Sequence, residues 1–475
     1  MTGPLQIAAI VIFVYFAVYN LLILALLAMS YGEMSWLVRG RQPGRSGLRP
    51  LAQRPGVSLV VPAYNEEELV VTTASALLDQ EYAPLEVVIV DDGSTDATFE
   101  RLNRAFDLVP LPIGGALELE STRIRGFYAS RVAPALRVLQ KENGGRADAL
   151  NAALSFARHE LVAVTDADCI LERDALTRLL RPFEEHPDHC IASGGNVRVV
   201  NASQIVDGRV VEPRVSWRGV DATQVIEYLR GFLGTRIAWS RMNGLVIVSG
   251  GFGLFRRDTL ITVGGFRKET LGEDMEVTLR LHHELRPGWP EARIAFVPDA
   301  VCWTQAPDNL RGLRTQRIRW QIGLLQTLRL HGGMFGRSRY GAAGLLAVPF
   351  VGLFEAIAAI FEVVGYVVIF TLVVVDPSSW PYLIAFFGIA VLFGQVQSFI
   401  ALLIEEVGFR RYGRAGMTRL LGWSLLEIFW YRPLLALWRT WATLSYVFGR
   451  RSVWGHIPRR ALDEAPAESV APLTR

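Results

Sequence analysis

A long run of apolar residues near the start of the chain limits what the chain can fold into more than any other feature. Residues 4–29 read PLQIAAIVIFVYFAVYNLLILALLAM, contain no charged side chain and are long enough to cross a bilayer as a helix. A cleaved signal peptide has a basic leader and a shorter apolar core, and this run has neither. We therefore predict an uncleaved transmembrane helix within residues 1–38 of a multi-pass protein of the cell membrane.

Basic residues follow this run, namely Arg39, Arg41, Arg45, Arg49 and Arg54. Because positive residues stay on the cytoplasmic side, we predict that the N-terminus lies outside and the next domain lies in the cytoplasm. Such arginines also suit an anionic lipid surface, so the lipid bilayer is a predicted partner. The net charge is only +3, which gives no electrostatic argument for binding nucleic acid.

Composition changes along the 475 residues and divides them into segments. Overall, 51% of the residues are hydrophobic and the mean hydropathy is +0.27, which is high for a soluble protein. The three cysteines, Cys169, Cys190 and Cys302, have no paired spacing, so neither a disulfide framework nor a zinc site is predicted. After the first helix, the predicted segments are a basic linker (39–56), a soluble α/β domain (57–305), amphipathic interface helices (306–340), transmembrane or interface helices (341–448) and a basic, then disordered, tail (449–475).

The α/β domain alternates short β-branched runs with helical patterns. VSLVVP, LEVVIVDD and ELVAVTDAD read as strands, and residues 67–80 and 147–158 read as helices. This alternation predicts a mostly parallel sheet that binds ligands at the carboxyl ends of its strands. Asp91 with Asp92, and Asp166 with Asp168, fall at two such ends. Paired carboxylates there suit Mg²⁺ or Mn²⁺ and a diphosphate, although an isolated D-x-D also caps helices.

Further motifs surround these aspartates. In chain order the sequence reads VVPAYNEE, VVIVDDGSTD, KENGGRADALNAAL, TDAD, GEDMEV and QRIRW. Together they resemble the membrane-embedded family 2 glycosyltransferases, the processive polysaccharide synthases that make cellulose, chitin, hyaluronan or poly-N-acetylglucosamine. The motifs cover about residues 55–325. The resemblance implies a cytoplasmic GT-A domain, with a Rossmann-like and mostly parallel sheet, joined to an α-helical transmembrane domain.

The resemblance also implies which residues bind the donor nucleotide and the metal. Pro62, Tyr64 and Glu66, with Asp91 and Asp92, would line the uridine and ribose site, although both aspartates also suit a turn that leads into a helix cap. The family usually has lysine where this chain has Arg146, and either cation suits a diphosphate, although the two are not interchangeable. Asp166 and Asp168 would hold Mg²⁺ or Mn²⁺, and Asp168 is the expected direct ligand.

GEDMEV resembles the family's T-E-D segment, with Gly272 in place of threonine. The resemblance makes Asp274 the catalytic base, which removes the proton of the acceptor hydroxyl, and places Glu273 beside it. The reaction would be a single inverting displacement that turns a UDP-α-sugar into a β-linkage. Carboxylates at the start of a helix also favour the helix dipole, so a capping role is the alternative.

QRIRW resembles the family's Q-x-x-R-W motif at Gln316, Arg319 and Trp320. The terminal acceptor sugar would stack on Trp320, while Arg319 would contact the diphosphate and Gln316 would order the site. The alternative is a membrane anchor, because arginine and tryptophan favour the headgroup zone. The motif gives Arg317 no role, so a simple anchor remains open for this residue. A loop that contains Gly250, Gly251 and Phe252 resembles the acceptor side of these synthases, with a plain tight turn as the alternative.

Charged residues also occur in the apolar half. Glu355 and Glu362 lie seven residues apart and share one helix face, where they would line a polysaccharide path or pair with Arg432 or Arg439. Because residues 420–448 contain Glu427 and both of these arginines, the sequence leaves open whether this stretch crosses the membrane.

The function expected from the resemblance is metal-dependent polymerisation of a UDP-sugar onto a growing polysaccharide, with export through the membrane. UDP-N-acetylglucosamine is the favoured donor, because KENGGRADALN and LFEAIAAIFEVVGY look most like poly-N-acetylglucosamine synthases. UDP-glucose is the runner-up. A non-processive transferase to a lipid carrier and an inactive scaffold are the alternatives, and the carboxylates at every expected position argue against the scaffold. Export or accessory subunits are further partners that this resemblance allows.

Overall fold

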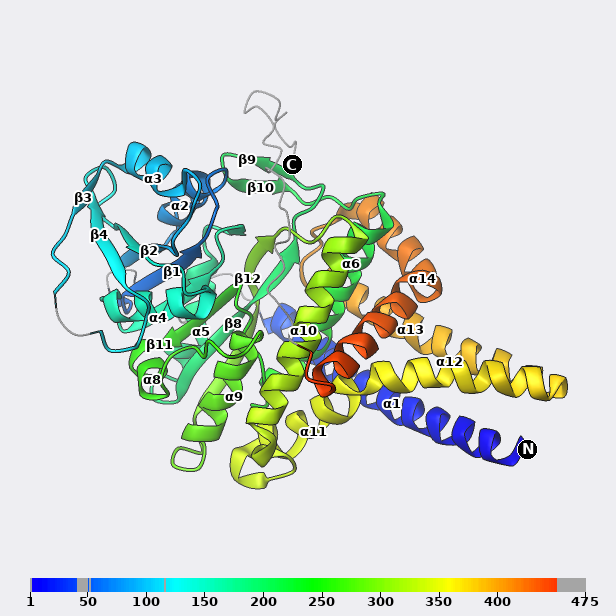
Figure 1. Ribbon diagram of the computed structural model, residues 1–475. Helices are drawn as coiled ribbons and strands as arrows, with labels where there is room; N and C mark the ends of the chain where they lie inside the picture. Colours follow the sequence, from blue (N-terminus) through cyan, green and yellow to red (C-terminus); the bar gives the residue numbers. More distant parts are fainter. Residues whose placement is uncertain (1, 41–49, 51–52, 115–116, 451–475) are drawn as a thin grey trace.

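A computed structural model describes residues 2–40, 50, 53–114 and 117–450. The predictions for most of the linker and for the C-terminal tail concern residues 41–49, 51–52 and 451–475, which lie outside the described residues. Figure 1 shows a sheet domain on one side and a group of long helices on the other.

Ten strands form one mixed sheet in the order β3-β4-β5-β2-β1-β6-β11-β8-β12-β7. The predicted runs form β1, β2 and β6, which pair in parallel with each other and with β5 at the centre of the sheet. The strands are β1 (Val57–Ala63), β2 (Leu85–Asp91), β3 (Leu108–Pro110), β4 (Ile124–Ser130), β5 (Leu136–Lys141), β6 (Leu161–Thr165), β7 (Cys169–Leu171), β8 (Cys190–Val199), β11 (Phe252–Arg256) and β12 (Arg293–Thr304), with a separate hairpin of β9 (Gln204–Val206) and β10 (Arg209–Glu212).

Several strands run antiparallel to this centre, which the sequence pattern does not predict. β11 pairs antiparallel with both β6 and β8, while β8 and β12 pair in parallel. β3, β4 and β7 are antiparallel to their neighbours at the two edges. The strands of the core are almost completely buried, because helices pack on the sheet: α4 on β1 and β2, and α5 on β8 and β12.

The helices continue the chain around the sheet and away from it. They are α1 (Thr2–Gly40), α2 (Val70–Leu78), α3 (Thr98–Phe106), α4 (Arg146–Phe156), α5 (Ala175–Glu185), α6 (Gly219–Leu229), α7 (Ile237–Arg241), α8 (Arg257–Thr262), α9 (Glu273–Leu285), α10 (Leu310–Leu330), α11 (Val348–Phe350), α12 (Ala358–Val375), α13 (Trp380–Gly408) and α14 (Gly413–Val447). Wider π-helical turns occur at Arg230–Arg236, Ala343–Ala347 and Val351–Ala356, and short 3₁₀ turns at Gly332–Met334, Ser338–Tyr340 and Pro377–Ser379.

Among the described residues, four helical segments are long and apolar enough to cross a membrane: Gly3–Arg39, Ala343–Val375, Pro377–Gly408 and Gly413–Val447. α1 packs on α12 and α13, and α14 packs on α12 and α13 as well as on α6 and α10. Large apolar side chains such as Ile7, Phe370 and Phe429 point outward from these helices, as expected for contact with lipid. The stretch that the sequence leaves open, residues 420–448, thus belongs almost entirely to one continuous helix.

Candidate functional site

The strands β1, β2, β5 and β6 are parallel, so the loops that follow them all begin on the same side of the sheet. This side, where the strands have their carboxyl ends, is called the carboxyl edge. At the end of β2, Asp91 accepts a hydrogen bond from the amide of Ser94 (3.0 Å), which forms the turn that the sequence predicts as the alternative. Asp92 accepts from the amides of Gly144 (3.0 Å) and Gly145 (2.8 Å). Burial raises the pKa of Asp92, and its bond with Lys141 opposes this. Asp92 therefore orders the loop before α4.

A glycine next to these aspartates lets two loops touch. Gly93 has a φ of +72°, and a Cβ there would lie 2.7 Å from the backbone nitrogen of Asn143. No other residue fits this contact without moving one of the two loops. Consequently the DDG turn and the NGG turn form one rigid unit at the edge of the sheet.

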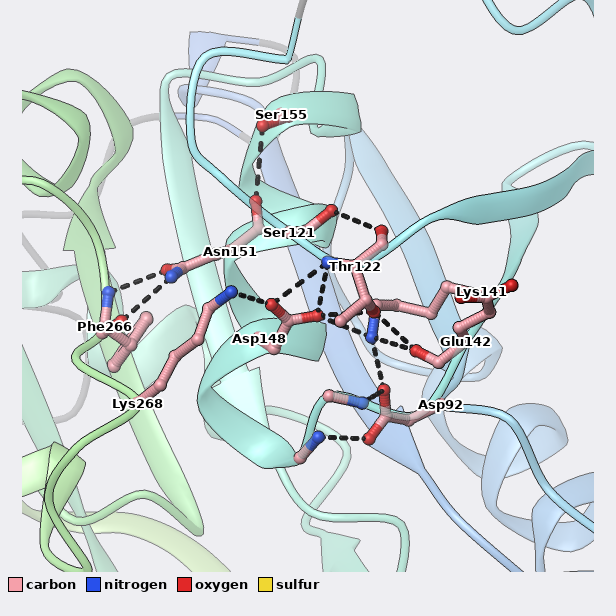
Figure 2. A network of polar contacts seen from close by, with 12 residues as sticks. Asp92, Ser121, Thr122, Lys141, Glu142, Asp148, Asn151, Ser155, Phe266 and Lys268 are labelled. Carbon is pink, nitrogen blue, oxygen red and sulfur yellow. Dashed lines mark hydrogen bonds and ion pairs between the residues drawn. The ribbon is translucent and has the colours of Figure 1, made fainter.

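Two buried carboxylates and two lysines connect this edge to the segment that precedes α9 (Figure 2). Lys141 is completely buried and pairs with Asp92 and, at 2.6 Å, with Asp148. Asp148 also pairs with Lys268 and accepts from the amide of Thr122 (3.0 Å). Burial alone would raise the pKa of Asp148, but the two lysines and the amide lower it overall.

Lys268 lies in the segment that leads into α9, and a second contact holds the same segment. The side chain of Asn151 donates to the carbonyl of Phe266 (2.8 Å) and accepts from its amide (2.7 Å), as Figure 2 shows. Sequence reasoning missed Lys141, Asp148 and Lys268. Lys141 and Asp148 fall within the KENGGRADALN motif, which was the available signal.

The residues expected around the nucleoside follow β1. Pro62 is part of β1, and Tyr64 in the loop after it is 46% exposed. The amide of Glu66 donates to Thr98 Oγ1 (2.9 Å), and the side chain of Asn65 accepts from the amide of Thr95 (2.8 Å). These bonds fasten the loop after β1 to the loop before α3, so Tyr64 and Glu66 lie near the turn that contains Asp91.

The expected metal ligands come together after β6. One oxygen each from Asp166 and Asp168 and the sulfur of Cys169 lie within 4.8 Å of one another. Thr304 Oγ1 donates to Asp168 Oδ2 (3.4 Å), which orients this carboxylate. Two close carboxylates supply the oxygen ligands that Mg²⁺ and Mn²⁺ prefer, so the residues present fit the implied cation.

Arg146 contacts both an expected metal ligand and an expected catalytic residue. Its guanidinium donates to Asp166 Oδ1 (2.8 Å), to Glu273 and to the carbonyl of Gly250 (2.8 Å). Burial would lower the pKa of Arg146, but Asp166 and Glu273 raise it overall, so this cation stays charged. Burial and Asp274 raise the pKa of Glu273, against the effect of Arg146.

Asp274 lies in the first turn of α9. Its Oδ2 accepts from the amide of Gly250 (3.1 Å), and its Oδ1 accepts from the amide of Met275 (2.8 Å). Glu273 pairs with Arg146 and also accepts from its own backbone amide in the first turn of α9, so its position agrees with the capping alternative as well. Gly272, which replaces the family's threonine, lies against Gly323 of α10: a Cβ at Gly323 would be 2.8 Å from the Gly272 nitrogen. The start of α9 therefore touches the helix of the QRIRW motif.

On α10, Trp320 keeps 42% of its surface exposed, and Arg319 is partly buried. Gln316 is buried, and its Oε1 has no hydrogen-bond partner in the part of the chain that the structure describes. Arg317 is also buried and pairs with Glu227 (2.6 Å), so the prediction that it is only an anchor is wrong.

The expected acceptor loop needs one correction. Gly250 and Gly251 are partly exposed, and Gly250 contacts both Arg146 and Asp274. Phe252, in contrast, is 0% exposed and packs over Gly195, because it begins the buried strand β11. The buried side chain of Phe252 cannot contact an acceptor, so the prediction that it binds the acceptor is wrong.

The long helices bury polar side chains between them. Arg230 pairs with Glu427, which also accepts from Ser398 (3.2 Å) and Arg432 (3.3 Å). Of the two glutamates predicted to share a helix face, Glu355 lies in the π-helical turn Val351–Ala356 and Glu362 lies in α12, where it accepts from the Tyr366 hydroxyl (2.6 Å). At Glu355 it is the backbone carbonyl that accepts from Arg439, and Arg439 also donates to Gln321 Oε1 (2.8 Å). Arg439 thus joins α14 to α10, and a second polar cluster surrounds Glu427. Together they are the polar region between the long helices.

Two family models match the chain. A model described as glycosyltransferase-like family 2 matches residues 127–323, and one described as glycosyl transferase family 2 matches residues 58–114. These two ranges contain every residue that was predicted to bind the donor, the metal or the acceptor.

The curated relatives with similar sequences include two poly-beta-1,6-N-acetyl-D-glucosamine synthases. That of Staphylococcus epidermidis is 29% identical over 276 residues, which are 57% of this chain and 55% of the relative. That of Staphylococcus aureus strain COL is 30% identical over 274 residues, which are 56% of this chain and 54% of the relative. The chain thus spans about half the length of these relatives.

A solved structure is similar over most of the chain. It is the mannosyltransferase PcManGT from Pyrobaculum calidifontis in complex with GDP-Man and Mn²⁺, with a TM-score of 0.50 and 20% identity. The match covers 91% of this chain and 100% of that one. This likeness shows a shared GT-A fold.

Proposed function

We propose that this chain, which belongs to glycosyltransferase family 2, polymerises UDP-N-acetylglucosamine into a β-linked polysaccharide and passes the product through the membrane. One observation carries the proposal. Arg146 donates to Asp166, an expected metal ligand, and to Glu273 of the GED segment. It also donates to the carbonyl of Gly250, whose amide donates to Asp274. Groups suited to a diphosphate, a base and an acceptor therefore meet at one point.

In the proposed reaction, Asp274 is the base. Its carboxylate accepts the proton of the acceptor hydroxyl while the hydroxyl oxygen forms a bond to the anomeric carbon of the donor. The bond from that carbon to the diphosphate breaks with its electron pair, and UDP leaves with the added negative charge. A single displacement inverts the configuration, so an α-linked donor gives a β-linked product.

Positive charge near the leaving group lowers the barrier. A divalent Mg²⁺ or Mn²⁺ ion held by Asp168 and Asp166 would neutralise charge on the diphosphate. Arg146 and Arg319 would hold the same group from the protein side, and Tyr64 would lie against the nucleoside. Trp320 would offer its exposed ring to the terminal sugar of the acceptor.

The choice of donor rests on the relatives. Both of the similar curated synthases are named for poly-N-acetylglucosamine, in agreement with the motif forms that favour UDP-N-acetylglucosamine. Because the chain spans only about half of their length, this donor is our proposal for the chain rather than a property taken over from them.

Export is the other part of the proposal, and the polar region between the membrane helices supports it. Arg439 donates to Gln321 of α10, the helix that also carries Trp320, and Glu427 forms a second polar cluster with Arg230, Ser398 and Arg432. A polysaccharide is rich in hydroxyl groups, so a path lined by such side chains suits it better than lipid does. In this arrangement the sheet domain lies in the cytoplasm, where nucleotide sugars are supplied.

UDP release by the detergent-purified chain tests the reaction. UDP-N-acetylglucosamine, UDP-glucose, UDP-galactose and UDP-glucuronate are offered in parallel with Mg²⁺ or Mn²⁺. We expect turnover of UDP-N-acetylglucosamine with formation of a polymer, and a rate that is roughly 10²–10⁴ lower for Asp274→Asn. Glu284→Gln, in the last turn of the same helix, is the matched control.

Two other outcomes would change the proposal. A lipid-linked monosaccharide as the only product would contradict polymerisation, and a full rate in Asp274→Asn would contradict the assignment of the base.

A further inference from the structure

The guanidinium of Arg317 lies against one face of the indole ring of Trp320. The guanidinium carbon of Arg317 lies 4.1 Å from the centre of the ring. Both residues belong to α10 and are three positions apart, which places them on the same side of the helix. Arg317 is 3% exposed, whereas Trp320 is 42% exposed. The cation therefore covers one face of the ring, and much of the remaining surface stays open.

Two other helices fix the position of this guanidinium. Arg317 Nη2 donates to Glu227 Oε2 of α6 (2.6 Å) and to the Tyr431 hydroxyl of α14 (3.3 Å). The Tyr431 hydroxyl in turn donates to Glu227 Oε2 (2.5 Å), which closes a triangle of three polar groups. The Tyr228 ring, 6.4 Å from that of Trp320, borders the same region.

This arrangement adds little to the stability of the folded protein. Within the described residues, the Nε and Nη1 atoms of Arg317 are buried and have no hydrogen-bond partner. A buried arginine with unused donors gains little net stability from one carboxylate, because its desolvation costs as much as the pairing returns. The contact with the indole ring is the interaction that the remaining guanidinium face makes.

We propose that Arg317 is a positioning residue for the acceptor: it sets the orientation of the Trp320 ring on which the terminal sugar stacks. This inference rests on the proposed function for the acceptor role of Trp320 and for the identity of the sugar. Because Tyr431 belongs to a membrane helix, the orientation of the ring also depends on where α14 lies against α6 and α10. The position of α14 thereby affects the orientation of the Trp320 ring through Tyr431, Glu227 and Arg317.

The test observes the ring itself. The chain is labelled with fluorinated tryptophan, and the ¹⁹F signal of Trp320 is assigned as the one that disappears in Trp320→Phe. A β-1,6-linked N-acetylglucosamine pentamer is then added. We expect Arg317→Met to shift the Trp320 signal without sugar, and to raise the pentamer concentration for half of the sugar-induced change about 3- to 30-fold, the range for one cation–ring contact.

Arg314→Met is the matched control, because Arg314 is an exposed arginine of the same helix. It is expected to leave the Trp320 signal, the sugar response and the rate of UDP release unchanged. In Arg317→Met the KM for UDP-N-acetylglucosamine stays at the wild-type value, since only the acceptor side is altered. A loss of structure would instead change the signals of the other tryptophans.

If Arg317→Met does not fold, Tyr431→Phe and Glu227→Gln decide, because the first removes a bond to the guanidinium, the second weakens one, and both leave the charge of Arg317. Both are expected to shift the Trp320 signal. A Trp320 signal and a sugar response that stay at wild-type values in Arg317→Met, or in both of these variants, would overturn the inference. A shift in Arg317→Met together with no response of the wild type to the pentamer would support positioning and contradict the proposed acceptor.

Discussion

Arg146 donates from Nε to Asp166 Oδ1 over 2.8 Å, so the expected diphosphate-binding cation is fixed to an expected metal ligand. The same guanidinium reaches Glu273 and the carbonyl of Gly250. Only a planar group with several N–H donors makes these three contacts at once, which gives a reason for arginine where the family usually has lysine.

Replacement of Arg146 separates its charge from its shape. We expect Arg146→Lys to lower the kcat for UDP release roughly 10-fold, because the charge remains but one ammonium does not reach all three acceptors. Arg146→Met removes the charge as well and is expected to cost roughly 10²–10³. Steady-state UDP release at saturating donor measures both. A wild-type kcat in Arg146→Lys would mean that the three-way bridge has no catalytic role.

The sequence predicted the place of the site better than its internal contacts. Asp91 and Asp166 follow β-branched runs, and parallel strands bring their carboxyl ends to one edge, so their clustering follows from local pattern alone. Lys141 and Asp148 were missed because Lys141 pairs with Asp92 and Asp148 pairs with Lys268, both far away along the chain. Such pairings have no periodic signature.

Two errors have the same origin. Phe252 follows two glycines and reads as part of a loop, but the antiparallel strand β11 inserts between β6 and β8 and buries it. Arg317 reads as an anchor beside an apolar run, but Glu227 and Tyr431 arrive from α6 and α14 and enclose it. In both cases a contact between distant elements overrides the local composition.

Metal binding is predicted to depend on Asp168. Asp168→Asn removes a carboxylate oxygen from the cluster of Asp166 and Asp168, so Mn²⁺ affinity is expected to fall at least by the roughly 10- to 100-fold typical of outer-shell changes. Electron paramagnetic resonance of free Mn²⁺ measures this directly, without turnover. Asp174→Asn, which loses only a surface pair with Arg178, serves as the control. Equal Mn²⁺ affinity in both variants would exclude Asp168 as a ligand.

Chelation gives the matching result for activity. Addition of EDTA is expected to stop UDP release by the wild type, and Mn²⁺ or Mg²⁺ in excess is expected to restore it. UDP release that persists in EDTA would contradict metal dependence.

Lys141 is predicted to be necessary for folding stability rather than for chemistry. It is completely buried between Asp92 and Asp148, so Lys141→Met leaves two buried carboxylates short of a cation. We expect a loss of about 3–5 kcal/mol in the free energy of unfolding. Denaturant unfolding followed by circular dichroism measures it. Lys268→Met serves as the comparison, because Lys268 is 37% exposed and its loss is expected to cost less. Equal losses would show that burial of the cation is not the reason.

His282 gives a prediction for the effect of pH. It is buried in α9, its Nε2 lies 2.9 Å from the carbonyl of Leu245, and burial together with Arg286 lowers its pKa to about 4. In the unfolded chain a histidine titrates near its ordinary value of 6.5. Between these two values the unfolded state binds a proton that the folded state does not, so acid favours unfolding.

The free energy of unfolding should therefore fall as the pH is lowered from about 6.5, by about 2 kcal/mol at pH 5 from this residue alone. His282→Gln can still donate to the Leu245 carbonyl but does not titrate, so its stability should change less over the same range. Urea unfolding of both proteins at pH 7, 6 and 5 measures the difference. Curves that fall in parallel would mean that His282 is protonated in the folded protein, and that the polar contact with Leu245 does not keep the ring neutral.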